Sequence, residues 1–413
     1  MQEIKSRVLR VVVADDSAVM RGIFRTLFAT HADDTDSKLP PMMICGEASD
    51  GVECLEMVRR TQPDVLLLDL EMPRMHGLGV LDRLRAENAE LPVIMCSAYT
   101  ELGARLTLDA LARGASDHVM KPSVESNFAC ALRVLSEQLL PKIAALAENP
   151  RRRCGAGLAE SAGRVDRRGM ARQRSALGLS SPRTEVVVIG ISTGGPSALE
   201  LMLSMLPADF PVPMLIAQHM PKLFTGALAE RLDGCCALQV KEAYEGAVAE
   251  PGTVWIAQGA THMEVRTALP QDMARRRRGE VRIHLHDKRP VNYCRPSADL
   301  LFQSAAEVYG TGTLALVMTG MGSDGAAGAR SVHQAGGMIW AQDEASSAVW
   351  GMPGRVTQTG VVDALVPLLS LGEELTRQAW LGRRRREELN ARQSFVAADG
   401  GMVRALEAVD GLF

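Results

Sequence analysis

Three polar residues stand where apolar runs of the chain end. Ser192 follows VVVIGI, His219 follows MLIAQ, and Asp324 follows TLALV after a short glycine-rich turn. A serine hydroxyl becomes a nucleophile when a histidine takes its proton, and a carboxylate fixes the tautomer of that histidine. These residue types therefore predict a hydrolytic triad if the fold brings them together. The turn Gly320–Gly325 would add backbone N–H groups for an oxyanion.

Other interpretations of the same residues remain open at this point. The segment around Ser192 is also typical of an anion-binding or purely structural turn, although it lacks the lysine of a Walker loop. It is not a GxSxG elbow, and the order Ser–His–Asp differs from that of α/β-hydrolases. Taken alone, His219 is typical of a structural histidine and Asp324 of a helix N-cap. The other histidines that compete as the base are His262, His284, His286 and His333.

A second group of polar residues gathers in the first third of the chain. Asp15 and Asp16 follow one apolar run and Asp69 follows another, while Ser97 and Lys121 end two more. Three carboxylates repel one another unless a hard cation lies between them, and Mg²⁺ prefers such oxygen ligands. A capping role for the aspartates and a surface role for Lys121 are the alternative. The recurrence of polar residues at four strand ends favours a functional site.

The elements that must position the first group of polar residues alternate in type. Apolar runs read as strands in RVLRVVVADD, MMICGEA, PDVLLLDL, LPVIMCSA and SDHVMKP. Helical patterns cover residues 18–29, 51–60, 77–86 and 103–112, and a further helix is expected over 125–147. This alternation predicts βαβ units and a doubly wound parallel sheet. The polar residues then lie together, because the carboxyl ends of parallel strands share one edge.

A second α/β series begins at residue 185. The expected strands are EVVVIG, PMLIAQH, GTVWIAQ, VRIHLH, TLALVMTG and GGMIWAQ, and the expected helices cover 196–205, 222–232, 297–309 and 324–335. Pro196 suits the first turn of a helix that follows Ser192. The charged segment 271–280 is typical of a hairpin tip between two strands. The fold class is therefore α/β in both halves, with a mostly parallel sheet in the second.

The composition of the chain indicates where its domains begin and end. Residues 148–183 hold nine arginines but three acidic residues and have almost no apolar periodicity, which is typical of a linker. We expect a first domain over 7–124, a helix and linker over 125–183, a second domain over 184–371 and an extension over 372–413. The extension holds another arginine run, Arg383–Arg386, which favours a solvated helix over a docking segment.

The overall composition excludes several classes of function. The 413 residues are 46% hydrophobic and carry a formal net charge of −3, so no general attraction to nucleic acid is expected. Apolar stretches do not reach the ~18–20 residues of a membrane-spanning helix. The eight cysteines are scattered without CxxC spacing. We expect a cytoplasmic protein without membrane insertion.

The first domain resembles the receiver domains of two-component response regulators. The matching motifs are ADDS (14–17), LLLDLEMPRMHGL (66–78), CSA (96–98) and VMKP (119–122). The resemblance implies that Asp69 is the phospho-acceptor and that Ser97 and Lys121 bind the phosphoryl oxygens. It further implies a Mg²⁺ site, whose ligands would be Asp16, Asp69 and the Glu71 carbonyl, assisted by Asp15. His118 replaces the usual Tyr or Phe, which puts the family's aromatic switch in question.

The second domain resembles the chemotaxis receptor methylesterase/deamidase family (CheB). The matching motifs are GISTGGPSAL, AQHMP, RPSADLLF, MTGMGSDG and WGMPGRV. The resemblance implies Ser192 as nucleophile, His219 as base and acid, Asp324 as orienting carboxylate and the Met321 backbone at the oxyanion. Ile191 and Gln258 depart from the common Ala and Pro without touching the triad.

The resemblance implies a phosphorylation-activated enzyme that demethylates glutamyl methyl esters on chemoreceptors and also deamidates glutamines there. Its partners would be methyl-accepting chemotaxis proteins as substrate and a chemotaxis histidine kinase as phosphodonor. The receiver needs Mg²⁺ and the hydrolytic step needs no cofactor. Before phosphorylation at Asp69, the receiver would pack over the Ser192 edge. A DNA-binding response regulator and a non-catalytic docking module are the alternatives.

Overall fold

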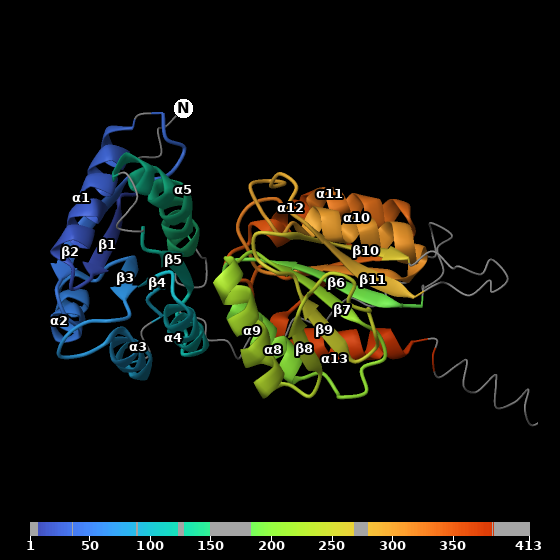
Figure 1. The fold of residues 1–413 in the computed structure, drawn as a ribbon. Helices are drawn as coiled ribbons and strands as arrows, with labels where there is room; N and C mark the ends of the chain where they lie inside the picture. The colour runs from blue at the N-terminus through green and yellow to red at the C-terminus, as the bar shows by residue number, and fades with distance from the viewer. Residues whose placement is uncertain are drawn as a thin grey trace, which may run out of the picture.

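The computed structural model describes residues 7–34, 36–87, 90–122, 128–148, 183–267, 280–381 and 383. Two α/β units lie side by side, the N-terminal one on the left in Figure 1. The predicted linker, the hairpin tip before Glu280 and nearly all of the C-terminal arginine run lie outside the described residues.

The first unit is built on a five-stranded sheet in the order β2-β1-β3-β4-β5, and all of its strand pairs are parallel. Its strands are β1 (Leu9–Ala14), β2 (Met42–Ala48), β3 (Val65–Asp69), β4 (Val93–Ser97) and β5 (Asp117–Met120). The order 2-1-3-4-5 is that of flavodoxin-like folds. The predicted fold class of this unit is therefore confirmed.

Five helices cover the two faces of this sheet. They are α1 (Ala18–Asp33), α2 (Gly51–Thr61), α3 (Gly77–Ala86), α4 (Glu101–Ala112) and α5 (Phe128–Ala147). One apolar cluster joins α1 and α5 to one face, and another joins α2, α3 and α4 to the opposite face. Helix α4 begins two residues earlier than expected, because the Thr100 hydroxyl accepts a hydrogen bond from the Gly103 N–H and caps it.

The second unit is built on a seven-stranded sheet in the order β14-β13-β12-β6-β7-β9-β8, again with parallel pairs throughout. Its strands are β6 (Val186–Ile191), β7 (Met214–Gln218), β8 (Gln239–Glu242), β9 (Thr253–Ile256), β12 (Thr313–Val317), β13 (Met338–Gln342) and β14 (Ala364–Val366). Strands β6, β7 and β12 are neighbours at the centre. These are the strands after which Ser192, His219 and Asp324 stand.

Helices cover both faces of this second sheet. Helices α8 (Gly195–Ser204), α9 (Lys222–Cys235) and α13 (Leu368–Trp380) pack on one face. Helices α10 (Ala298–Tyr309), α11 (Ala326–Gln334) and α12 (Met352–Gln358) pack on the other. The antiparallel pair β10 (His262–Thr267) and β11 (Val281–His286) lies against α10. The predicted α/β class with a mostly parallel sheet is confirmed.

Several elements were not predicted. Strands β8, β10 and β14 and helices α12 and α13 are short or have a mixed apolar and polar pattern. Helix α13 runs across the boundary expected at residue 371, since Leu371, Leu375 and Ala379 are buried and the helix packs on α8. Residues 372–380 are thus part of the second packed unit in this structure.

The two units touch through α4, which packs on α8 and α9. The apolar cluster on the α4 face of the first sheet continues into the α8 and α9 face of the second sheet. Arg231 on α9 bonds Glu200 of its own unit and Asp109 on α4, each at 2.9 Å.

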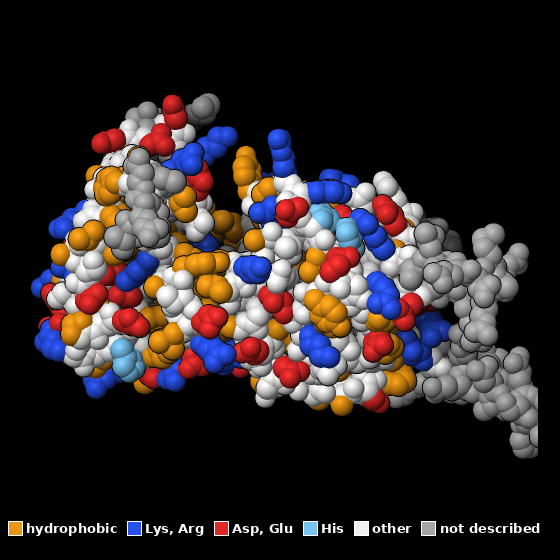
Figure 2. All heavy atoms as spheres, in the orientation of Figure 1, with side chains coloured by type: hydrophobic (Ala, Val, Ile, Leu, Met, Phe, Trp, Pro, Cys, Tyr) orange, Lys and Arg blue, Asp and Glu red, His pale blue; other side chains and the backbone are white. Residues whose placement is uncertain are grey.

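Acidic and basic side chains are interspersed over the face shown in Figure 2.

Candidate functional site

Ser192 stands at a sharp corner between β6 and α8. Its N–H donates to the Thr319 carbonyl at 3.0 Å, which ties the corner to the chain that follows β12. Gly194 has a φ of +76°, and a Cβ on Gly195 would lie 2.0 Å from Oε1 of Gln218. Both positions therefore require glycine. The predicted strand-to-helix turn is confirmed, and it holds Ser192 at the carboxyl edge of the sheet.

His219 lies beside this corner because β7 pairs with β6. Its N–H donates to the Ile191 carbonyl at 3.0 Å, and its Nε2 lies 2.9 Å from Oδ2 of Asp324. Its other ring nitrogen, Nδ1, lies 3.6 Å from Sγ of Cys294. Within the described part of the chain, the Ser192 hydroxyl makes no hydrogen bond to this imidazole. The histidine and the carboxylate are thus paired, and Ser192 lies at the neighbouring strand end without a bond to this imidazole in the described chain.

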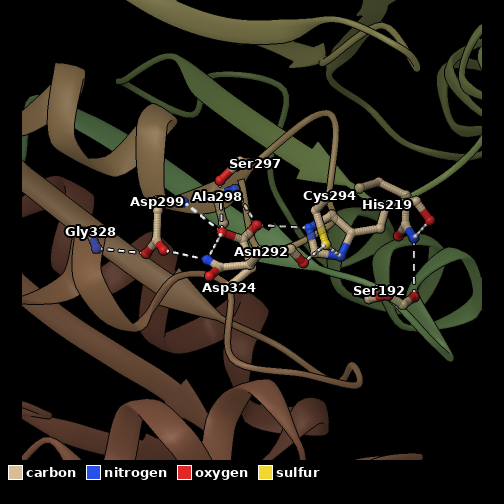
Figure 3. Close-up of polar contacts among 10 residues, drawn as sticks. Ser192, His219, Asn292, Cys294, Ser297, Ala298, Asp299, Asp324 and Gly328 are labelled. Carbon is tan, nitrogen blue, oxygen red and sulfur yellow. Dashed lines mark hydrogen bonds and ion pairs between the residues drawn. The ribbon is translucent and has the colours of Figure 1, made fainter. Parts of the chain in front are cut away.

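Asp324 is held by donors from the segment before α10 and from its first turn (Figure 3). Oδ1 accepts from the Ser297 hydroxyl at 2.7 Å, and Oδ2 accepts from the Ala298 N–H at 2.6 Å. Asn292 Nδ2 bridges Oδ1 of Asp324 and Oδ2 of Asp299 at 3.3 and 2.8 Å. The aspartate therefore accepts hydrogen bonds from the N-terminus of α10 and does not cap α11, which follows it in sequence. The positive end of the α10 dipole stabilises its charge.

The electrostatics of the pair follow from this arrangement. Burial disfavours the charged imidazole of His219, but its hydrogen bonds with Asp324 and Cys294 outweigh this effect and raise its pKa to about 9. Burial also opposes the charge on Asp324, yet its bonds to His219, Ser297 and Ala298 hold the pKa of its carboxyl below the usual range. The pair is therefore an imidazolium–carboxylate pair at neutral pH in this structure.

Met321 lies in the turn that follows β12. A Cβ on the preceding Gly320 would lie 2.8 Å from Cβ of Ser192, so this turn runs against the serine. Among the described residues, the Met321 N–H donates to no acceptor. Its side chain packs against the apolar cluster of α1, α5 and the first sheet, a cluster that also includes Val349 of the second unit. The backbone donor is thus free for an oxyanion, while the side chain lines a cavity together with Ala145 of the first unit.

The competing histidines have other partners. His284 bonds Glu245, His286 bonds Glu264, and His262 lies 3.1 Å from the Arg289 carbonyl. His333 is in the last turn of α11. In the described structure none of these four bonds Ser192 or Asp324, which leaves His219 as the histidine of the site.

The carboxylates predicted in the first unit converge as expected from the strand order. One oxygen each from Asp15, Asp16 and Asp69 lies within 4.8 Å of the others. Lys121 Nζ lies 2.9 Å from Asp15 and 2.8 Å from Asp69. Burial raises the pKa of Asp69 to about 6, although Lys121 opposes this shift. An all-oxygen donor set of this kind fits Mg²⁺.

Ser97 and Glu71 are the remaining residues predicted for the site in the first unit, and one is buried while the other is exposed. Ser97 is buried at the end of β4, and its hydroxyl lies 3.9 Å from Sδ of Met120 on β5. Glu71 is exposed two residues beyond Asp69, and its backbone hydrogen-bonds the Asp69 carboxylate. Ser97 and Lys121 thus lie at the carboxyl ends of adjacent strands, β4 and β5.

The first unit contacts the corner that holds Ser192, and sequence reasoning missed the residues that do so. Asp117 at the start of β5 accepts a hydrogen bond from the Thr193 hydroxyl at 2.7 Å. Lys142 on α5 lies 3.0 Å from the same carboxylate. His118 stacks on Phe224 of α9, with ring centroids 4.7 Å apart. No spacing in the sequence indicates these contacts, because they join segments of separate domains.

The first unit has the fold and the polar residues of a receiver. The second unit carries Ser192, His219 and Asp324 at one edge of its sheet. Together they define the class of response regulators whose second domain is a hydrolase. Residues 11–133 match the family model of the response regulator receiver domain, and residues 187–375 match that of the CheB methylesterase. The chain belongs to the CheB methylesterase family. This assignment contradicts both alternatives, the DNA-binding regulator and the non-catalytic module.

Similar proteins cover nearly the whole chain. A protein of Trichodesmium erythraeum named protein-glutamate methylesterase/protein-glutamine glutaminase is 38% identical over 89% of this chain and 98% of its own. A protein of the same name from Nocardioides is 40% identical over 90% and 95%. The crystal structure of the Thermotoga maritima CheB catalytic domain is 39% identical, with a TM-score of 0.44, and covers 47% of this chain and 98% of that one.

The described helices include none long and apolar enough to cross a bilayer.

Proposed function

We propose that this protein hydrolyses glutamyl methyl esters on chemoreceptors, and deamidates glutamines there, through Ser192, His219 and Asp324. The observation that carries the proposal is the 2.9 Å bond between His219 and Asp324 at the strand end next to Ser192. The names of the relatives support glutamate esters and glutamines of a protein as the substrate groups. The functional units would be the receiver over 7–124, the helix and linker over 125–183, and a catalytic domain that begins at 184 and includes α13 to residue 380, followed by an extension.

In the proposed acylation, Ser192 Oγ attacks the γ-carbonyl carbon of the ester while His219 takes the hydroxyl proton. Because Nε2 is bonded to Asp324, Nδ1 is the nitrogen left to accept that proton. The Met321 N–H stabilises the oxyanion of the tetrahedral intermediate. As the intermediate collapses, the C–O bond to the methoxy group breaks and the proton on His219 passes to it, giving methanol. With a glutamine substrate the leaving group is ammonia.

In the proposed deacylation, a water molecule attacks the acyl-serine carbonyl and gives its proton to His219. The proton then returns to Ser192 Oγ as the ester bond breaks, and the product is a free glutamate side chain. The imidazolium formed in each half-reaction is stabilised by Asp324, whose own charge is supported by Ser297 and the first turn of α10. No cofactor takes part in these steps.

We further propose that phosphorylation of Asp69 by a chemotaxis histidine kinase in the cytoplasm activates hydrolysis. Asp15, Asp16 and Asp69 would hold Mg²⁺ together with the Glu71 carbonyl, and the ion would neutralise charge on the incoming phosphoryl group. Lys121 and Ser97 would then bind the phosphoryl oxygens. Lys121 lies four residues from Asp117, which bonds the neighbour of the nucleophile, so a change at β5 reaches the Ser192 corner directly.

The release of methanol from methylated chemoreceptor membranes tests the esterase. We expect Ser192→Ala to abolish the release, and a variant that releases as much as the parent would rule out the mechanism. Ser204→Ala is the matched control, since this serine lies at the end of α8 and bonds only its own helix. Its release should equal that of the parent.

The effect of acetyl phosphate with Mg²⁺ tests the gating. The parent should release methanol faster when this phosphodonor is present. Asp69→Ala should keep the basal rate and lose the stimulation, because it removes the acceptor carboxylate while Lys121 keeps its other partner, Asp15. Equal stimulation of both proteins would contradict activation through Asp69.

A further inference from the structure

Cys294 is a reactive group beside the triad that the proposed mechanism does not use. Its Sγ lies 3.6 Å from Nδ1 of His219, and it is partly exposed. The turn that holds it is tight: the Val291 N–H donates to the Cys294 carbonyl and the Cys294 N–H donates back. Asn292 and Tyr293 between them have φ values of 51° and 62°, as in a two-residue hairpin turn. The thiol is therefore fixed in place.

The separation of these two atoms suits a metal ion. Zinc bonds thiolate sulfur at ~2.3 Å and imidazole nitrogen at ~2.1 Å, so two such ligands at a tetrahedral angle lie about 3.6 Å apart. Sγ of Cys294 and Nδ1 of His219 have this spacing. One ligand-type atom from each of His219, Cys294 and Asp324 also lies within 4.8 Å of the others.

Asp324 has the role of an outer carboxylate in this arrangement. Both its oxygens already accept hydrogen bonds from the α10 segment, and Oδ2 also bonds His219 Nε2. Histidines that bind metals almost always donate their other ring N–H to such a carboxylate, which orients the free nitrogen. Here Asp324 holds the imidazole of His219 with Nδ1 toward Cys294.

We propose that Cys294 Sγ and His219 Nδ1 bind a thiophilic divalent cation, best matched by Zn²⁺, and that its binding inhibits hydrolysis. On binding, the Cys294 thiol and the Nδ1 of the His219 imidazolium each release a proton to solvent, and the remaining coordination positions are filled by water or the Ser192 hydroxyl. The imidazole lone pair that must accept the serine proton is then engaged by the cation. This inhibitory site goes beyond the proposed function and rests on it only for the effect on activity.

The carboxylates of the receiver form a separate site with different chemistry. Asp15, Asp16 and Asp69 offer oxygen alone, which favours Mg²⁺, whereas Cys294 and His219 offer sulfur and nitrogen. An excess of Mg²⁺ therefore occupies the receiver and leaves the Cys294–His219 site free for a thiophilic cation. This difference allows the two sites to be separated in one experiment.

Cobalt absorption tests the binding without any need for activity. Co²⁺ is added to the full-length Ser192→Ala protein in excess Mg²⁺, and a thiolate-to-cobalt charge-transfer band is expected. Adding Cys294→Ser should remove the band, while adding Cys235→Ser should leave it, since Cys235 is exposed on α9 away from the triad. A band that survives Cys294→Ser, or one that never forms, overturns the proposal.

Inhibition of methanol release tests the consequence. Zn²⁺ should inhibit the parent, a chelator should restore it, and Cys294→Ser should be at least roughly 10-fold less sensitive, because losing even an outer partner of a metal ligand costs roughly 10- to 100-fold in affinity. Equal sensitivity of Cys294→Ser and the parent contradicts inhibition through this site. Cys294→Ala gives the same comparison if the serine variant folds poorly. A protein that never releases methanol would refute the proposed function instead, and the cobalt result would still decide the binding.

Discussion

At the scale of single residues, the proposed chemistry rests on the bond between His219 and Asp324. The carboxylate accepts from Ser297, Ala298 and Asn292 as well as from the imidazole, so it is held in one orientation. The pKa of His219 is raised to about 9, which keeps the ring protonated in this structure. A base must be neutral, so the esterase rate of this state should rise with pH toward that value.

Asp324→Asn should change both activity and the pH dependence of stability. The methanol release rate should fall about 10⁴-fold, because the imidazole loses the carboxylate that fixes its tautomer. The folded-state pKa of His219 lies above its ordinary 6.5, so the stabilisation by the pair is complete below pH 6.5 and is lost as the pH rises through about 9. The loss in the free energy of unfolding should thus be about 3 kcal/mol below pH 6.5, decline as the pH rises from 6.5 to about 9, and nearly vanish above 9.

Urea denaturation of parent and variant on both sides of this pH range measures the effect. Asp233→Asn is the control, because its carboxylate accepts from the Val240 N–H and has no histidine partner. Its destabilisation should stay constant where that of Asp324→Asn declines. A constant difference for Asp324→Asn would contradict the ion pair.

At the scale of secondary-structure elements, β5 links the two chemical sites. It carries Asp117 at its start, and Lys121 follows its end. Asp117 is buried, and its pKa is lowered because Lys142, His118 and Thr193 together outweigh the effect of burial. His118 is the residue that departs from the usual aromatic, yet it stacks on Phe224 as an aromatic side chain would. A flat ring at this position therefore contacts α9 while the receiver is docked.

Thr193→Val should loosen the contact between β5 and the Ser192 corner. The change leaves Asp117 without a charge-assisted hydrogen bond, which is worth about 1.5–3 kcal/mol, so the undocked population should rise roughly tenfold or more. Faster amide hydrogen exchange in β5 and α8 of the unphosphorylated protein would show that this undocked population has increased. Thr26→Val on α1, whose hydroxyl bonds only Gly22 of its own helix, should leave that exchange unchanged. Unaltered exchange in Thr193→Val would mean that this bond does not hold the units together.

At the scale of the whole molecule, the receiver lies against the catalytic unit through apolar and charged contacts. The apolar cluster shared by α4, α8 and α9 gives the contact its area, and Arg231–Asp109 and Arg105–Glu230 lie at its border. A cavity of about 290 Å³ remains between α5 and the loop at 344–351, and Met321 lines it. A cavity thus remains beside the turn that holds Met321 while the receiver is docked.

Asp109→Ala should raise the basal esterase rate modestly. The pair with Arg231 is partly exposed, and such pairs contribute up to about 1 kcal/mol, so the rate of the unphosphorylated enzyme should increase at most about fivefold. Its dependence on salt should also weaken, because a screened interaction has been removed. Asp82→Ala breaks an ion pair with Arg113 within the receiver and is the matched control. An unchanged rate and salt dependence in Asp109→Ala would exclude a role for this pair in docking.

The amino-acid sequence by itself determined both α/β folds and the candidate residues of both sites. Apolar runs that end in Asp69, Ser192 and His219 fix the strands, and parallel strands bring their carboxyl ends to one edge whatever their order in the chain. The sequence also contained the spacing of Leu371, Leu375 and Ala379 that builds α13, which a boundary drawn by composition overlooked.

Only the tertiary structure decided which groups touch across long separations. Asp324 stands before α11 in sequence yet accepts from the N-terminus of α10, and Cys294 faces His219 from a separate turn. Asp117 meets Thr193 across the contact between the two units. Such contacts depend on the packing of whole elements, which local periodicity does not encode. The triad could thus be expected from residue types, whereas its outer partners and its docking to the receiver required the fold.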